Sequence, residues 1–181
     1  MTSINFKNKT VLITGGTKGI GLEITKTFLR LDANVVVLAR NKPSRKIQAK
    51  GNASLYVECD IRNLESIDNA LKTIKSQYRT LDILINNAGG GPLVDSISAS
   101  PKFHQAIIDL NLMAPLNVSQ KVGKLMMKQK TISNIINISS VTATRPTPGS
   151  AAYGAAKGAL VNLTKTLAIE WAPKIKVNAI I

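Results

Sequence analysis

The sequence contains very few cysteine, histidine and aromatic residues. Its 181 residues include one cysteine, Cys59, one histidine, His104, and only 4% aromatic side chains. A single cysteine excludes an intrachain disulfide and a thiolate metal cluster within one chain. His104 stands among polar residues without nearby cysteines or carboxylates, so we expect it at the surface and expect no metal site.

Long apolar runs are also absent from the sequence. No stretch approaches the roughly 20 apolar residues that a membrane-spanning helix needs. The first ten residues, MTSINFKNKT, contain no hydrophobic signal-peptide core. We therefore expect a cytoplasmic protein that does not bind membranes.

Acidic residues are scarce relative to basic ones. Ten Asp and Glu residues stand against 24 Lys and Arg residues, which gives a formal net charge of +14. Such a charge raises the possibility of nucleic-acid binding. The basic residues are scattered from Lys7 to Lys176 and accompany no helix-turn-helix or aromatic-studded sheet motif. We expect no specific nucleic-acid partner, since binding of anionic small ligands or of an acidic partner suffices to explain the positive net charge.

Short aliphatic segments alternate with segments of helical periodicity along the whole chain. Expected strands cover residues 9–14, 34–39, 54–57, 81–85, 134–139 and 175–180, and expected helices end near residues 31, 78, 130 and 170. Asn63 is the expected N-cap of the second helix. This alternation predicts an α/β fold, a Rossmann-type doubly wound parallel β-sheet in a three-layer α/β/α arrangement. We expect one dinucleotide-binding domain over residues 1–181.

A glycine-rich turn joins the first expected strand to the first expected helix. Its sequence is Gly15-Gly16-Thr17-Lys18-Gly19-Ile20-Gly21. Glycines at such a turn let the backbone approach a pyrophosphate, which the amides at the helix N-terminus then hold. An ordinary glycine-rich turn is the alternative, and nucleotide binding is the favoured interpretation.

The end of the second expected strand indicates which dinucleotide is bound. A fold that prefers NAD places an acidic residue there for the ribose 2′-hydroxyl. Arg40 occupies this place, and no acidic residue occurs between Asp32 and Glu58. Arginine binds a 2′-phosphate, and Lys18 supplies a second positive charge. The sequence therefore predicts a preference for NADP(H), with NAD(H) possible. In the alternative interpretation, both cations are merely solvated.

Tyr153 and Lys157 stand four residues apart at the start of the last expected helix, after a strand that ends in Ser139 and Ser140. That spacing places phenol and ammonium on one helix face. A nearby cation favours the phenolate form of a tyrosine. Polar groups at the carboxyl end of a parallel strand lie where such sheets bind ligands. The pair alone is a weak signal of catalysis.

Together these motifs resemble one known family. Their order along the chain resembles that of the short-chain dehydrogenase/reductase superfamily, in particular its 3-oxoacyl-carrier-protein reductase branch. The motifs are, in order, TGGTKGIG, the Cys-Asp pair, NNAG, Asn111, the serine pair and YGAAK. The resemblance covers essentially all 181 residues. It implies an oxidoreductase that transfers hydride between a nicotinamide and a carbonyl or secondary alcohol.

The resemblance also implies roles for individual residues. Tyr153 matches the general acid/base, Lys157 the residue that assists it and binds the nicotinamide ribose, and Ser140 the residue that holds the substrate oxygen. Asn111 matches the asparagine that organises a proton-relay water, and Asp60 the acid that bonds adenine. The implied cofactor-binding residues are Thr14, Gly15, Thr17, Lys18, Gly19, Ile20, Gly21, Arg40, Asp60, Ile61, Asn87, Ala88, Gly89, Tyr153 and Lys157.

The chain departs from the family pattern at its C-terminus. The resemblance implies a further substrate-binding loop, helix and last strand, whereas this sequence stops at Ile181. We expect a domain truncated at its C-terminus, either a fragment of a longer gene product or a truncated product with impaired activity, whose terminal strand is an uncovered apolar edge. A dinucleotide-binding or interaction protein with impaired or no turnover is therefore the alternative function.

The resemblance implies a homodimer or homotetramer. Small residues on one face of the last expected helix, Ala152, Ala155, Ala156 and Ala159, are a candidate subunit interface. Tight packing of this helix on its own sheet is the alternative explanation.

Overall fold

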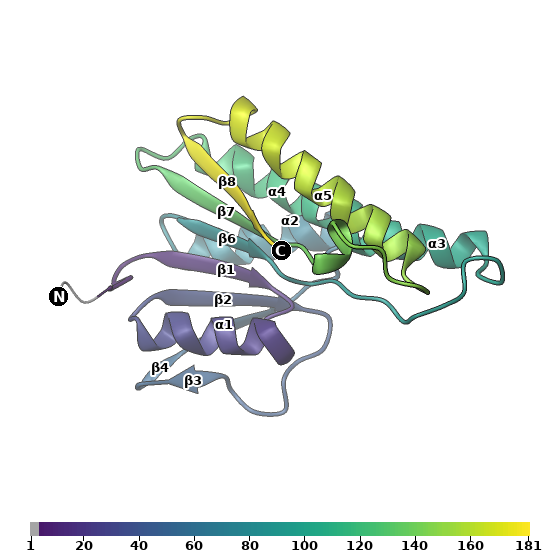
Figure 1. Ribbon diagram of the computed structural model, residues 1–181. Helices are drawn as coiled ribbons and strands as arrows, with labels where there is room; N and C mark the ends of the chain where they lie inside the picture. The colour runs from purple at the N-terminus through teal and green to yellow at the C-terminus, as the bar shows by residue number, and fades with distance from the viewer. Residues whose placement is uncertain (1–3) are drawn as a thin grey trace.

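A six-stranded parallel sheet forms the centre of the computed structural model, which describes residues 4–181 (Figure 1). The strand order is β5-β2-β1-β6-β7-β8, and every neighbouring pair is parallel. The bounds are β1 (Thr10–Thr14), β2 (Asn34–Ala39), β5 (Leu55–Glu58), β6 (Ile83–Asn86), β7 (Ser133–Ile138) and β8 (Ile175–Ile180). The predicted doubly wound sheet is confirmed.

Helices lie on both faces of the sheet. They are α1 (Gly19–Arg30), α2 (Leu64–Gln77), α3 (Pro101–Ile108), α4 (Ala114–Met126) and α5 (Ala151–Glu170). The predicted N-cap of α2 is confirmed, since the side chain of Asn63 accepts a hydrogen bond from the backbone N–H of Ser66 at 2.9 Å. Among the described residues, no helix is long and apolar enough to cross a membrane.

Alternating side chains of each strand feed two separate apolar cores. Val11 and Ile13 of β1 pack with Leu29 of α1 on one face. Leu12, between them, belongs to the other core, which includes Val118 of α4 and side chains of α2 and α5. This period-2 division is what a strand buried on both faces requires.

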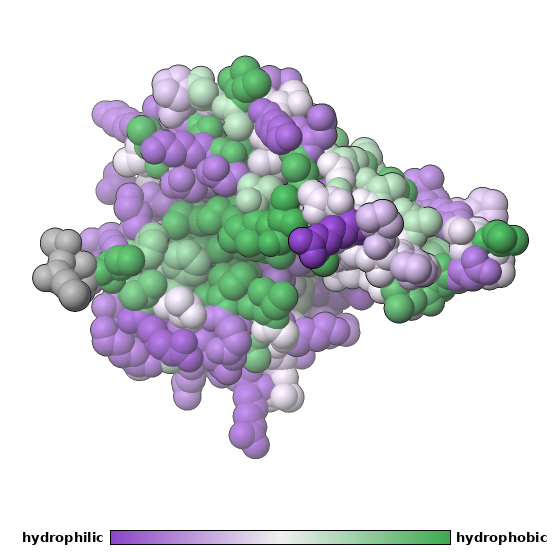
Figure 2. All heavy atoms as spheres, in the orientation of Figure 1, coloured by the Kyte–Doolittle hydropathy of each residue, from purple (hydrophilic) through white to green (hydrophobic). Residues whose placement is uncertain are grey.

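The face that carries α1 is only partly covered. In Figure 1, α1 lies in front of the sheet next to β2, while α2 and α4 lie behind the sheet. Figure 2 shows apolar side chains gathered in the middle of this face. Ile136 and Ile138 of β7 are only partly buried there, and Ile180 of β8 is 57% exposed. The structure thus presents an apolar surface beside the edge strand β8, as the sequence predicted for this strand.

The long helix predicted from residue 101 to residue 130 is interrupted. After α3 the backbone widens into one π-helical turn, Asp109–Met113, before α4 begins at Ala114, and α4 ends at Met126. Pro115 has no N–H to donate to the carbonyl four residues earlier, at Asn111. A π-turn accommodates such a missing bond without ending the helix.

A short hairpin that the sequence analysis missed lies between β2 and β5. Its strands, β3 (Gln48–Ala49) and β4 (Asn52–Ala53), pair antiparallel. Lys50 and Gly51, with φ of 51° and 79°, form the two-residue turn. Asn52 donates hydrogen bonds to the backbone carbonyl of Leu29 at 3.0 Å and to the carboxylate of Asp32 at 3.1 Å. The hairpin is thereby fixed to the C-terminal end of α1.

The ring of Trp171 connects the C-terminal ends of α4 and α5. Trp171, the C-cap residue of α5, lies against Gly123 of α4. A Cβ atom at Gly123 would lie 3.3 Å from the indole ring, so glycine at this position allows the ring to approach the helix backbone. The only tryptophan of the chain is therefore part of this helix contact.

Candidate active site

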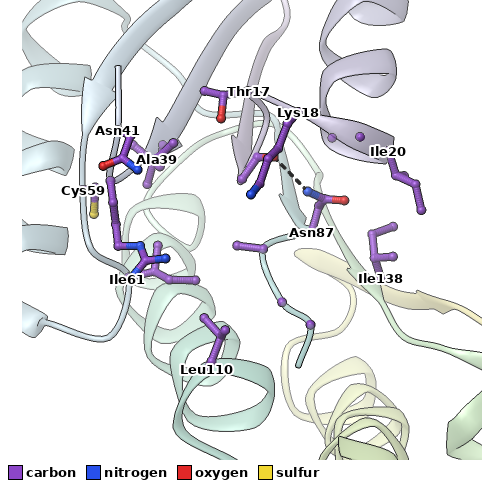
Figure 3. Close-up of a pocket in the computed structure, with 18 of the residues that line it drawn as sticks. Thr17, Lys18, Ile20, Ala39, Asn41, Cys59, Ile61, Asn87, Leu110 and Ile138 are labelled. Carbon is purple, nitrogen blue, oxygen red and sulfur yellow. Dashed lines mark hydrogen bonds between the residues drawn. The ribbon is translucent and has the colours of Figure 1, made fainter. Parts of the chain in front are cut away.

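A cavity of about 680 Å³ opens at the carboxyl ends of the strands (Figure 3). This is where open parallel sheets bind their ligands. Its wall is formed by the β1–α1 turn, the end of β2, the segment after β5, the segment after β6, the end of β7 and the start of α5. In Figure 3, Cys59 and Ile61 lie on one side of the cavity, and Asn87 and Ile138 lie on the other.

The glycine-rich turn brings bare backbone to this cavity. Gly15 has a φ of +67°, a conformation that side chains rarely adopt. At Gly21 a Cβ atom would overlap the carbonyl of Gly15 and the side-chain nitrogen of Asn87. Gly19 and Ile20, the first residues of α1, also line the cavity. The first amides of α1 have no intrahelical acceptor and provide a site for an anion.

Thr14 and Asn87 join the ends of β1 and β6 beneath this turn. The hydroxyl of Thr14 accepts hydrogen bonds from the backbone N–H groups of Asn87 and Ala88, both at 3.0 Å. The side chain of Asn87 donates to the carbonyl of Thr14 at 3.0 Å. It also donates to the carbonyl of Gly15 at 3.2 Å (Figure 3). Thr14 is buried and does not line the cavity, so it shapes the turn from below.

Positive side chains from two segments line the cavity, the β1–α1 turn and the loop after β2. Arg40 and Lys18 line the same cavity, as predicted for a 2′-phosphate pocket. Asn41, Lys42 and Pro43 line it as well, and the sequence analysis did not single them out. Their position in the loop directly after Arg40 was the available signal.

Asp60 is already paired with a cation. Arg62 donates to its carboxylate from Nε at 3.0 Å and from a terminal nitrogen at 2.6 Å. This two-pronged contact is the main reason that the pKa of Asp60 is lowered, and Arg40 adds a weaker electrostatic contribution. Any donor that reaches Asp60 therefore meets an ionised carboxylate shared with Arg62.

Tyr153 and Lys157 both line the cavity from the first turns of α5. The Nζ atom of Lys157 lies 5.7 Å from the centroid of the Tyr153 ring and donates a 2.7 Å hydrogen bond to the carbonyl of Ile138. Lys157 is 4% exposed, and this burial lowers the pKa of its amine to about 8. Loss of water disfavours the charged form of an amine.

Asn111 lies in the π-helical turn and is fully buried. Its side-chain oxygen accepts from the backbone N–H of Gly90 at 2.8 Å, and its nitrogen donates to the carbonyls of Gly90 at 3.0 Å and Ile107 at 2.9 Å. A Cβ atom at Gly89 would lie 2.7 Å from this oxygen and 3.3 Å from Nζ of Lys157. Asn111 and Lys157 therefore approach one another across Gly89.

The two serines after β7 lie in different environments. Ser140 is half-buried and lies outside the cavity wall. Its hydroxyl oxygen accepts hydrogen bonds from the backbone N–H of Thr142 at 3.2 Å and from the Thr142 hydroxyl at 2.9 Å. Ser139 does line the cavity and donates to the carbonyl of Lys157 at 3.1 Å. Ser139 thus holds the helix that carries Lys157.

Most of the predicted site residues come together around one cavity. Thr14, Asn111 and Ser140 are the predicted residues that do not form its wall. Ser139, named beside Ser140 in the sequence analysis but given no role there, is part of the wall. The wall residues that the sequence analysis did not assign to the site are Leu38, Ala39, Asn41, Lys42, Pro43, Cys59, Gly90, Leu110 and Ile138. Several stand directly beside predicted residues, and adjacency was the signal for them.

His104 was expected at the surface, but it is half-buried. Its ring centroid lies 5.8 Å from that of Phe103, in an edge-to-face arrangement. Within residues 4–181, no group of three or more His, Cys, Asp or Glu side chains is placed to hold a metal ion.

The strand order, the glycine turn and the cavity across the strand ends define a dinucleotide-binding α/β protein. A sequence model of the family described as short chain dehydrogenase matches residues 9–181, and the chain belongs to this family of oxidoreductases. Members of this family bind NAD(H) or NADP(H) and act on small molecules.

Among curated proteins, the chain is 38% identical to Oxidoreductase UcpA of Escherichia coli (strain K12), over 95% of this chain and 67% of the relative. It is 35% identical to the 3-oxoacyl-[acyl-carrier-protein] reductase of Synechocystis sp., over 93% of this chain and 71% of the relative. The aldohexose dehydrogenase of Thermoplasma acidophilum, solved in ligand-free form, superposes with a TM-score of 0.88 at 30% identity. That match covers 96% of this chain and 65% of the other. The chain thus spans about two thirds of the length of these proteins.

Proposed function

We propose that this chain is an NADP(H)-dependent oxidoreductase that interconverts a carbonyl compound and a secondary alcohol. The observation that carries the proposal is that one cavity joins two sets of groups. Lys18 of the β1–α1 turn lines it with Arg40 and Lys42 after β2, and Tyr153 and Lys157 line it on α5. The first set suits a phosphate, and the second set suits proton transfer beside it.

The residues present fit a dinucleotide that carries an extra phosphate. A Cβ atom at Gly21 would collide with Asn87 and Gly15, and Gly15 has a positive φ, so both positions need glycine for this turn at the start of α1. No acidic residue stands between Asp32 and Glu58 to repel a 2′-phosphate at the end of β2. Arg40 and Lys18 supply compensating charge there.

When bound, the nicotinamide supplies or accepts the hydride. In the proposed chemistry, the hydroxyl of Tyr153 gives a proton to the carbonyl oxygen, or its phenolate takes the proton from the alcohol. Lys157 places its amine 5.7 Å from the centroid of the Tyr153 ring, while Ile138 and Ser139 fix its position. Such general acid–base transfer contributes on the order of 100- to 10,000-fold in rate.

Ser140 and Asn111 have supporting roles in this proposal. Ser140 lies at the N-terminus of the short Val141–Ala143 turn and would donate its hydroxyl proton to the substrate oxygen. Asn111 fixes the Gly90 backbone at the cavity edge through paired hydrogen bonds. Asp60, ionised by its pairing with Arg62, is suited to accept from an adenine amino group.

Titration of the purified chain with NADPH and NADH tests the cofactor preference. We expect tighter binding of NADPH, and we expect Arg40→Asp to weaken it by about 10- to 100-fold, because a charge-assisted contact is replaced by repulsion. Arg45→Asp is the matched control, since Arg45 makes the same charge change outside the cavity wall. Equal binding of both cofactors by the unmodified chain would contradict the preference.

A screen of carbonyl substrates then separates turnover from binding alone. A dinucleotide-binding protein without turnover is the second candidate, and the partly covered sheet face of this chain favours it. Tyr153→Phe decides between the two, because it removes the proposed acid while leaving the ring in place. Loss of turnover with retained NADPH binding supports the enzyme, and no turnover in either form supports the second candidate.

We also propose that the chain forms a homodimer or homotetramer, as family members commonly do. The small side chains of α5 support an interface on this helix only in part. Ala156 is fully buried within the chain, whereas Ala155 is exposed. Sedimentation measurements over a range of concentrations test this proposal.

A further inference from the structure

A line of buried polar side chains runs beneath the floor of the cavity. Asn86, the last residue of β6, donates from its side-chain nitrogen to Oγ of Ser119 and to Oδ1 of Asn137, both at 2.8 Å. Asn137, on β7, donates in turn to Oγ1 of Thr164 at 2.9 Å. All four residues are at most 5% exposed. The line connects α4, β6, β7 and α5 in that order.

The α5 end of this line fixes the register between β7 and the helix that carries Lys157. Three successive residues of β7 and its extension bind α5. Asn137 donates to Thr164, the carbonyl of Ile138 accepts from Nζ of Lys157, and the hydroxyl of Ser139 donates to the carbonyl of Lys157. Thr164 lies about two helical turns beyond Lys157. A shift of α5 along β7 would therefore displace the amine from its acceptor.

The β6 end of the line is connected to Asn111 through the segment that follows β6. The segment after Asn86 continues to Gly89 and Gly90, and Gly90 exchanges two hydrogen bonds with the side chain of Asn111. The close approach of Asn111 and Lys157 occurs across Gly89. The hydrogen bond between Asn86 and Asn137 links β6 directly to β7. The segment after β6 binds Asn111, and β7 binds Lys157.

Stability alone gives a poor account of this line. Oδ1 of Asn86 is buried and has no hydrogen-bond partner among the described residues. A buried acceptor without a partner is destabilising, and apolar side chains of similar shape in place of both partners are often neutral or stabilising. The pairing of two asparagines at this position therefore calls for a reason other than the free energy of folding.

We propose that Asn86, Asn137 and Thr164 are positioning residues that hold Lys157 and Asn111 at the spacing used for proton transfer at Tyr153. This inference rests on the proposed function. It assigns no contact with substrate or cofactor to the three residues. Their effect passes through the register of α5 against β7 and through the segment that follows β6.

Substitution of Thr164 gives a conservative test. Thr164→Val keeps the shape of the side chain and removes the acceptor of Asn137, whereas Thr164→Ser keeps the hydroxyl. We expect Thr164→Val to lower kcat by about 10- to 100-fold with little change in the Kd of NADPH, because small displacements of catalytic groups cost this much. Thr164→Ser should restore kcat. Thr166→Val is the control, since Thr166 is exposed on the same helix.

A double variant separates positioning from stability. We expect Asn86→Leu/Asn137→Leu to keep or raise the Tm while kcat falls. A kcat equal to that of the unmodified chain in folded Thr164→Val protein would overturn the proposal. A loss of kcat that is accompanied by an equivalent loss of Tm, and that Thr164→Ser does not restore, would also overturn it.

A third readout does not require turnover. The pH titration of the Lys157 amine can be followed by NMR of 13C-labelled lysine and assigned with Lys157→Met. Thr164→Val should shift this titration, and Thr166→Val should not. An unchanged titration in Thr164→Val would overturn the positioning role even if the unmodified chain neither binds NADPH nor turns over substrate. That last result would contradict the proposed function by itself.

Discussion

Lys157 shows how one buried side chain connects folding to chemistry. Its amine is 4% exposed, and burial lowers its pKa from 10.5 to about 8. Between these two values the unfolded chain keeps the proton that the folded chain has lost. The unfolded state then binds more protons, so the free energy of unfolding rises with pH across this window.

We expect this rise to disappear when the amine is removed. The free energy of unfolding of the unmodified chain, minus that of Lys157→Met, should increase by about 3 kcal/mol from about pH 8 to about pH 10.5. Urea unfolding at a series of pH values measures this difference. Lys124→Met, at an exposed position of α4, should show no such change. A difference that stays constant with pH would contradict the shifted pKa.

The local part of the site was predictable at this scale, and the nonlocal part was not. Tyr153 and Lys157 share a helix face because they are four residues apart, which the sequence shows directly. The bonds from Lys157 to Ile138 and Ser139 depend on how α5 lies against β7. The orientation of the Ser140 hydroxyl towards Thr142 likewise depends on a turn that has no strong sequence signal.

Among the elements, the turn into α1 and the helix α5 make opposite demands on glycine. A side chain at Gly21 would collide with Asn87 and Gly15. At Gly158, within α5, a Cβ atom would lie 3.5 Å from the nearest carbonyl oxygen, which is an ordinary contact. Alanine in a helix interior is about 1 kcal/mol more favourable than glycine.

We therefore expect the two glycine-to-alanine changes to have opposite signs. Gly158→Ala should raise the free energy of unfolding by about 0.5 to 1 kcal/mol. Gly21→Ala should lower it by about 1 to 3 kcal/mol and abolish NADPH binding, because the turn must move. Thermal and urea unfolding measure both values. Stabilisation by Gly21→Ala would show that the turn is not closely packed.

The sequence predicted the helices and strands that have a strong hydrophobic periodicity. It did not predict the short hairpin or the π-helical turn, which have no such periodicity of their own. The buried strands are continuous aliphatic runs, such as residues 34–39, and were found within a few residues of their bounds. The β3–β4 hairpin has two residues per strand, too few for a hydrophobic pattern. The π-turn before Pro115 leaves the apolar spacing helical, so residues 101–130 read as one helix.

For the molecule as a whole, the two faces of the sheet differ in cover. One face packs against α2, α4 and α5, and the other packs against α1 and the β3–β4 hairpin. The alternation of strands and helices predicts a parallel sheet. The cover of each face depends on the side of the sheet on which each strand-to-strand connection places its helix. No local sequence pattern predicts that side.

The partly covered face should bind neutral apolar dyes. We expect Nile red fluorescence to increase with this chain, and Ile180→Lys to reduce the increase at least about two-fold, because this side chain is 57% exposed on this face. A neutral dye avoids the attraction of anionic dyes to a chain of charge +14. Ile97→Lys, at a 94% exposed loop position, is the control and should leave the signal unchanged. An equal loss in the control would point to charge rather than to this face.

The contact between Trp171 and Gly123 also makes the protein its own spectroscopic probe. Because the chain has one tryptophan, all of its indole emission comes from the junction of α4 and α5. The wavelength of that emission reports whether these two helices stay packed, without an added label. The same two helices hold Ser119 and Thr164, so tryptophan fluorescence can follow their separation while turnover is assayed in the same sample.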